Sequence, residues 1–157
     1  MTSRIALIAF AILGSLGAPA ALAGLLDDPP PTLADRRTAV VVYRLGPVHF
    51  DPDQVDTIVT CSNAGDQPVE VVLELFDETD VRVGVARGQG SAGDQITFST
   101  AAEPDAITVA GLPPLEHGKG RVSAGSASIS CAAKHRVRGD DGTIKESSVE
   151  LMKKVAR

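Results

Sequence analysis

The sequence predicts an all-β fold, an antiparallel β-sandwich of about 7–9 short strands. Short segments with alternating apolar and polar residues recur along most of the 157-residue chain. Turn-forming residues separate these segments at intervals of roughly 8–15 residues, and no convincing long helix follows the N-terminus. We therefore expect a single β-sandwich domain over residues 38–157.

The first 23 residues have the features of a cleavable signal peptide. Arg4 gives a positive start, and the apolar run from Ile5 to Leu16 is too short to span a bilayer. The following Ala21-Leu22-Ala23 matches the small-x-small cleavage pattern. We expect cleavage after Ala23 and a secreted or periplasmic protein without a stable membrane anchor. The alternative interpretation is an uncleaved anchor.

Residues 24–37 are expected to form a flexible, proline-rich leader. Three consecutive prolines, Pro29 to Pro31, favour an extended unpaired chain, and no periodic apolar pattern accompanies them.

The composition disfavours several classes of ligand. Arg4 is the only charged residue of the signal peptide, so the mature chain has 14 basic and 20 acidic residues, a net charge of −6. This sign argues against a nucleic-acid partner. Sugar-binding surfaces commonly need exposed aromatic rings, and this chain has one Tyr, four Phe and no Trp. The segment from Lys134 onward differs, because its seven basic and four acidic residues give +3.

The first expected strands lie on either side of a polar turn. Residues 38–45 are rich in β-branched residues, and Gly46-Pro47 is expected to end this first strand. Residues 55–61 and 69–75 alternate with a period of two, which predicts two strands with one buried face each. Because turn formers fill residues 62–68, we interpret this pair as a hairpin.

The rest of the chain predicts further strands separated by loops. Strands are expected at residues 81–86, 95–99, 106–110, 120–124 and 128–138, with glycine-rich loops at 87–93 and 111–120. Residues 120–124 are expected at a sheet edge. Residues 139–142 have the composition of a hairpin turn. Residues 144–155 fit either a strand or a helix, and the preceding turn favours the strand.

The two cysteines, Cys61 and Cys131, are expected to form a disulfide. An even number of cysteines in an exported chain favours pairing, and free thiols or a metal pair are the alternative. A bond between an early and a late strand is similar to the inter-sheet disulfide of immunoglobulin domains. This resemblance implies an immunoglobulin-like sandwich in which the bond joins opposing sheets. The chain departs from that family in having no Trp and in having Ile129 two residues before the second cysteine.

Gly88 to Gly93 match the G-x-G-x-x-G pattern of dinucleotide-binding proteins. That motif requires a helix directly after it, whose N-terminus binds the pyrophosphate. Here residues 95–99 predict a strand instead. We therefore interpret the glycines as a flexible loop, and we expect no cofactor.

Two sets of residues are candidates for metal ligands. Asp51, Asp53 and Asp56 place three carboxylates within six residues, which suits calcium, although a solvated acidic loop explains them better. The three histidines of the chain, His49, His117 and His135, have no metal-binding spacing and could bind a metal only if the fold brought them together.

The sequence predicts no catalytic residues. It has no G-x-S-x-G nucleophile elbow, and paired cysteines are poor nucleophiles. We expect a non-enzymatic structural or protein-interaction module that contacts another exported protein through a sheet edge near the C-terminal hairpin. The alternative is a metal- or calcium-dependent binding protein or enzyme of the cell exterior. Convergence of the candidate ligands in the fold would favour this alternative.

Overall fold

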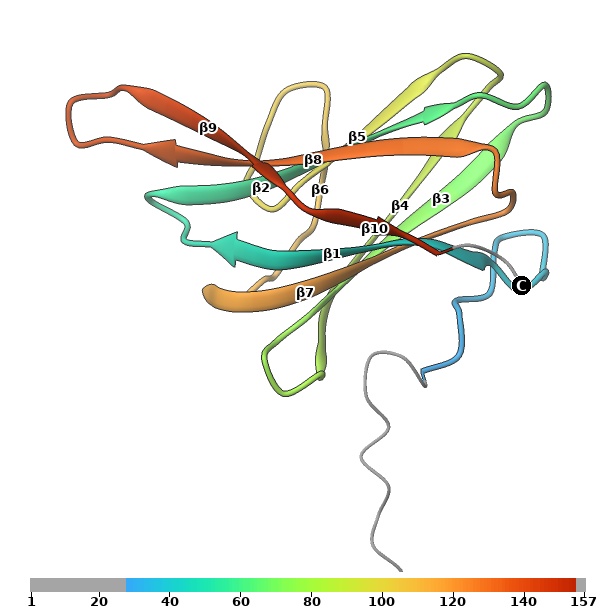
Figure 1. The fold of residues 1–157 in the computed structure, drawn as a ribbon, viewed down its shortest axis with the longest axis horizontal. Helices are drawn as coiled ribbons and strands as arrows, with labels where there is room; N and C mark the ends of the chain where they lie inside the picture. Colours follow the sequence, from blue (N-terminus) through green and yellow to red (C-terminus); the bar gives the residue numbers. More distant parts are fainter. Residues whose placement is uncertain (1–27, 155–157) are drawn as a thin grey trace, which may run out of the picture.

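The computed structural model describes residues 28–154, and this part of the chain contains ten β-strands and no helix (Figure 1). The strands form two five-stranded sheets, in the orders β10-β1-β7-β3-β4 and β6-β5-β2-β8-β9. All paired neighbours are antiparallel except β5 and β6. The strands are β1 Val40–Phe50, β2 Val55–Asn63, β3 Val69–Phe76, β4 Arg82–Gly90, β5 Gln95–Ser99, β6 Ile107–Thr108, β7 Leu115–Ala124, β8 Ile129–Arg138, β9 Ile144–Val149 and β10 Leu151–Lys153.

The predicted all-β sandwich is therefore confirmed. The strands outnumber the 7–9 expected partly because the C-terminal stretch, which is strand as favoured, divides into β9 and β10. Glu150 alone separates these two strands, yet they belong to different sheets. The chain thus crosses from one layer to the other at this residue.

The hydrophobic core lies between the inner faces of the two sheets. Val71, Leu73 and Leu75 of β3 are buried there together with Val59 of β2 and Phe98 of β5. The two-residue spacing along β3 is the one that the sequence predicts. Full burial of side chains of this size stabilises the fold by about 1.5–3 kcal/mol each.

The predicted hairpin of residues 55–61 and 69–75 is wrong in its pairing, although both strands exist. β2 pairs with β5 and β8, whereas β3 pairs with β4 and β7 in the other sheet. The largely exposed segment between them therefore passes from one sheet to the other instead of turning within one sheet. Alternation specifies which face of a strand is buried, but it does not specify the neighbour that the strand pairs with.

The disulfide between Cys61 and Cys131 is present, but its place differs from the one that the immunoglobulin resemblance implies. The two residues are direct partners in the β2–β8 ladder, so the bond joins neighbours within one sheet. The bond closes a loop with a sequence separation of 70 residues. Closing a loop of this length restricts the unfolded chain, and this stabilises the folded state by about 4 kcal/mol.

Two predicted boundaries are corrected where glycines occur inside strands. β1 continues through Gly46-Pro47 to Phe50 with register shifts instead of ending at Leu45. β7 begins at Leu115, where a loop was expected, and lies between β1 and β3 instead of at an edge. A side chain at Gly120 would come within 2.6 Å of Leu45, so this glycine permits close packing in a strand.

The side of the sandwich formed by β4 with β5 and β6 is called the glycine side below. β4 extends to Gly90, so half of the predicted glycine loop is strand. A Cβ atom on Gly88 would lie 2.5 Å from Cγ2 of Ile96, and one on Gly84 would lie 2.5 Å from Cδ2 of Leu112. The glycines of the G-x-G-x-x-G pattern that belong to β4 thus let the two sheets approach closely.

The described part of the predicted leader packs against the outer face of the first sheet. Leu33 is buried with Ala39 and Val72, and Arg121 of β7 donates to the carbonyl oxygen of Asp28 at 2.8 Å. Arg121 also forms a buried ion pair with Glu74 of β3, with 2.7 Å between Nη2 and Oε2. These contacts hold the segment on the sheet.

The predicted signal peptide and its cleavage site after Ala23 lie outside the described residues. Among residues 28–154, we find no helix with the length and apolar character needed to cross a membrane.

Candidate functional site

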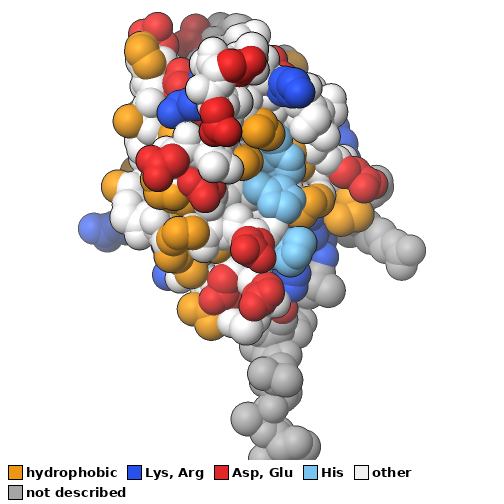
Figure 2. Space-filling view, turned by 90° about the vertical axis from the view of Figure 1, so that its left-hand side faces the viewer, with side chains coloured by type: hydrophobic (Ala, Val, Ile, Leu, Met, Phe, Trp, Pro, Cys, Tyr) orange, Lys and Arg blue, Asp and Glu red, His pale blue; other side chains and the backbone are white. Residues whose placement is uncertain are grey.

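The three histidines, far apart in the sequence, form one continuous row on the surface (Figure 2). His49 of β1 is in the middle of the row. The centre of its ring lies 4.7 Å from that of His135 on β8 and 5.9 Å from that of His117 on β7. The planes of the rings meet at 81° and 74°, respectively.

The strand pairing explains why the histidines meet. β1 and β7 are neighbours, and Val48 pairs with Gly118, which places His49 next to His117. His135 lies in the opposite sheet, where its ladder partner is Thr57 of β2. The Thr57 hydroxyl donates to the carbonyl oxygen of His49 at 2.8 Å. This hydrogen bond therefore joins β1 to the sheet that carries His135.

The ring of His135 is oriented by a backbone hydrogen bond. Its Nε2–H donates to the carbonyl oxygen of Pro47 at 3.1 Å, which leaves the lone pair on Nδ1. Burial lowers the pKa of His135 below its ordinary value, and repulsion from His49 lowers it further, while the bond to Pro47 opposes both effects. The pKa shift therefore favours the neutral form of the ring.

The three predicted calcium ligands do not gather at one point. Asp51 Oδ1 accepts the backbone N–H groups of Asp53 at 2.9 Å and Gln54 at 3.3 Å, so it closes the turn between β1 and β2. Asp56 is buried and paired with Arg136 of β8. Within residues 28–154, no three His, Cys, Asp or Glu side chains are already arranged to hold a metal ion.

Asp56 belongs to an ion cluster on the β2–β8 ladder. Arg136 hydrogen-bonds to both Asp56 and Glu103, and Arg138 Nη2 lies 3.7 Å from Asp56 Oδ2. The hydrogen bond from Arg136 lowers the pKa of Glu103, and the two carboxylates raise that of Arg136. Because Asp56 is buried, the cluster is a structural ion pair that holds the segment containing Glu103 on the sheet.

An edge that no other strand of residues 28–154 covers, called the free edge, lies beside the histidine row. β9 and β10 are end strands of their sheets and follow each other directly, so residues 144–153 form one edge along this side of the molecule. Of the six residues in β9, five are exposed, and only Val149 is buried. The β8–β9 hairpin projects beyond the rest of the sandwich (Figure 1). We call this side, with β1 and β8 next to it, the crossing side.

The register shows which backbone groups of β9 face outward. The Arg138 amide donates to the carbonyl oxygen of Gln54, so it points away from its β9 partner Ile144. In an antiparallel ladder, hydrogen-bonded and non-hydrogen-bonded pairs alternate. The backbone N–H and C=O groups of Ile144, Glu146 and Ser148 therefore face away from β8.

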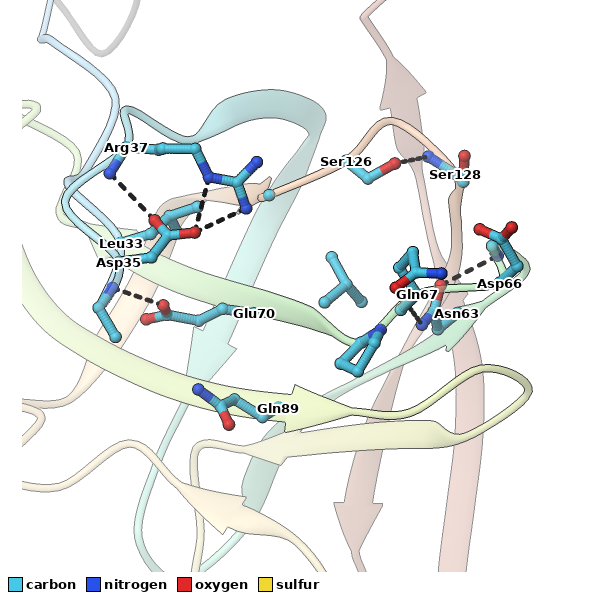
Figure 3. A pocket seen from close by; sticks show the side chains of 15 residues that line it. Leu33, Asp35, Arg37, Asn63, Asp66, Gln67, Glu70, Gln89, Ser126 and Ser128 are labelled. Atoms are coloured by element: carbon cyan, nitrogen blue, oxygen red, sulfur yellow. Dashed lines mark hydrogen bonds and ion pairs between the residues drawn. The ribbon is translucent and has the colours of Figure 1, made fainter.

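A pocket of about 410 Å³ lies at the other end of the sandwich, between the leader and the β2–β3 connection (Figure 3). The Asn63 side-chain amide donates to the Gln67 carbonyl oxygen at 2.8 Å. The Glu70 carboxylate accepts the Ala34 N–H at 2.7 Å and an Arg87 N–H at 2.8 Å. These polar groups therefore bind one another and hold the surrounding segments in place.

Comparisons with known proteins show only the fold. No protein-family model matches the chain, and no curated protein matches its sequence. The crystal structure of Thermotoga maritima 1070 is similar, with a TM-score of 0.50 and 11% identity. The match covers 70% of this chain and 93% of that chain. At this identity, the likeness concerns the architecture and carries no information about activity.

Proposed function

We propose that this chain is an exported, non-catalytic interaction module whose free edge, residues 144–153, pairs with an extended segment of another exported polypeptide. The predicted signal peptide supports export, and the disulfide is compatible with an oxidising compartment. In strand addition, the backbone bonds supply the affinity and alternate side chains supply the specificity.

The observation that carries this proposal is the unpaired edge itself. Ile144, Glu146 and Ser148 present successive outward backbone groups, and these are the groups that an added antiparallel strand would bond. The exposed apolar side chains of Ile144 and Met152, 57% and 58% accessible, lie on the same edge.

The charged residues of the edge would restrict which strand can pair. Lys145 and Glu146 stand next to each other in β9, and Lys134 binds Glu146 at 2.6 Å. Charges on an edge strand discourage indiscriminate pairing between sheets. A segment with complementary charges at these positions would be preferred.

A proline at Ser148 tests the edge directly. Extended peptides would first be selected against the folded domain by display. Ser148→Pro removes an outward N–H without breaking a β8–β9 bond, so we expect it to abolish peptide binding while the domain stays folded. Ser148→Ala is the matched control and should bind as well as wild type.

Hydrogen exchange supplies the second measurement. The amides of Glu146 and Ser148 should exchange rapidly in the free protein and become protected when a peptide binds. The amide of Ser147, which faces β8, should be protected in both states. Equal binding by Ser148→Pro, or protection elsewhere without protection of this edge, would show that strand addition here is not the function.

A further inference from the structure

We infer that His49 and His135 form the core of a binding site for a divalent transition-metal ion, Zn²⁺ or Cu²⁺, with His117 as a third ligand. This inference goes beyond the proposed interaction function and stands independently of it. It rests on the distances in the histidine row, on the hydrogen bond that orients one ring and on the kind of donor atom present.

The ring separations suit a shared ion. Two imidazoles that bind one ion through nitrogens at about 2.0–2.1 Å have ring centres about 4.5–6 Å apart. The His49–His135 separation is 4.7 Å and the His49–His117 separation is 5.9 Å, so both fall in that range. Edge-to-face packing of neutral rings gives similar distances, and the experiment below separates the two explanations.

The surroundings of His135 resemble those of metal-binding histidines. Such histidines commonly donate their second ring N–H to a backbone carbonyl, which fixes the tautomer and the ring orientation. His135 donates from Nε2 to Pro47, so Nδ1 is the available donor atom.

His49 and His117 differ in how firmly they are held. The His49 backbone is anchored to Thr57 by bonds of 2.8 Å and 3.3 Å. His117 is exposed, so its side chain can rotate toward the ion. Because no three such ligands among residues 28–154 are already arranged around one point, binding by all three histidines requires this rotation.

The donor type indicates the class of metal. Imidazole nitrogen suits zinc, copper and nickel, whereas calcium and magnesium require oxygen ligands. Asp51 and Asp56 are occupied by turn and ion-pair contacts, and the two cysteine sulfurs are bonded to each other. The histidine row is therefore expected to select a transition metal over calcium.

The test uses the untagged chain with its disulfide intact, titrated with ZnCl₂ or CuCl₂ and measured by equilibrium dialysis. We expect saturable binding of one ion per chain, and Cu²⁺ electron paramagnetic resonance should show coupling to imidazole nitrogen. His49→Gln and His135→Gln should each weaken binding at least about tenfold. His117→Gln should weaken it less.

Two further variants serve as controls for this experiment. The sequence has three histidines, so the triple His→Gln variant has no imidazole and should lose the nitrogen coupling and the binding. Asp53→Asn, which removes a carboxylate from the β1–β2 turn, should bind as wild type does. Unfolding measured with EDTA present checks that each variant still folds. Saturable binding that survives in the triple variant, or its absence in wild type, would overturn the inference and leave ring packing as the explanation.

Discussion

On the glycine side the two sheets meet over nearly bare backbone, whereas on the crossing side the chain passes from one sheet to the other between β9 and β10. Gly84 and Gly88 of β4 leave no room for a Cβ atom. On the crossing side, β9 presents five exposed residues and the histidine row lies at the surface. The first side is therefore constrained by packing, while the second presents many of its side chains to solvent.

The largest expected effect comes from adding one methyl group on the glycine side. Gly88→Ala should lower the free energy of unfolding by about 1–3 kcal/mol, because its Cβ would overlap Cγ2 of Ile96 and lie 2.7 Å from Cδ1 of Ile107. Urea unfolding measures the change.

The exposed residue Val85, on the same strand, supplies the matched control: Val85→Ala should change stability by less than about 1 kcal/mol. Combining Gly88→Ala with Ile107→Val should recover part of the loss, because the second change removes one overlapping carbon. A Gly88→Ala variant as stable as wild type would contradict the close approach of the sheets.

A smaller effect is expected from acidification, and it should arise on the crossing side. Folding lowers the pKa of His135 through burial and through repulsion from His49. The unfolded chain therefore binds more protons, and stability should fall as the pH drops below about 6.5, the ordinary pKa of histidine.

Melting temperatures at pH 7.5 and 5.5 would measure this effect, and His135→Gln should reduce the difference between them. The lowered pKa values of Glu103 and Asp77 act in the same direction only at lower pH, near the ordinary pKa values of carboxyl groups. An unchanged pH dependence in His135→Gln would show that this ring is not the group responsible.

The smallest effects are expected at the free edge. Ser148→Ala and Lys134→Met should each change the free energy of unfolding by about 0.5 kcal/mol or less. Ser148 is exposed, and both side chains of the Lys134–Glu146 pair are nearly half exposed. Chemical denaturation checks both variants. If either variant lowered the free energy of unfolding as much as Gly88→Ala does, the two sides would not differ in how strongly packing constrains them.

Alternation in the sequence was enough to locate most strands, but it did not identify their partners. Residues 55–61 and 69–75 have the pattern of strands with one buried face, and both are strands. Their separation into different sheets depends on the more distant strands β7 and β8. Glycines were misread for a related reason. In the sequence, Gly88 is typical of a loop. Its role in close packing depends on the side chains of the opposing sheet, which the local sequence does not show.

The candidate site could be predicted only in part. The histidines were identified as possible ligands, but their convergence depends on β1 continuing past Gly46-Pro47, where the sequence predicted an end. The alternation of Val48 and Phe50 around His49 was the available signal for that continuation. Asp56 was grouped with Asp51 because they are close in sequence, but it is buried and its partner Arg136 is 80 residues away.

The cysteine bridge has a mechanical consequence because it connects neighbours in one layer. It prevents β2 and β8 from sliding past each other, since a shift of even one position would separate the two sulfur atoms. It does not oppose the peeling apart of the two layers. Both cysteines of the chain are used in this bond, so cohesion between the layers depends on the connecting segments, on hydrogen bonds such as that from Thr57 to His49, and on the exclusion of water from the interior.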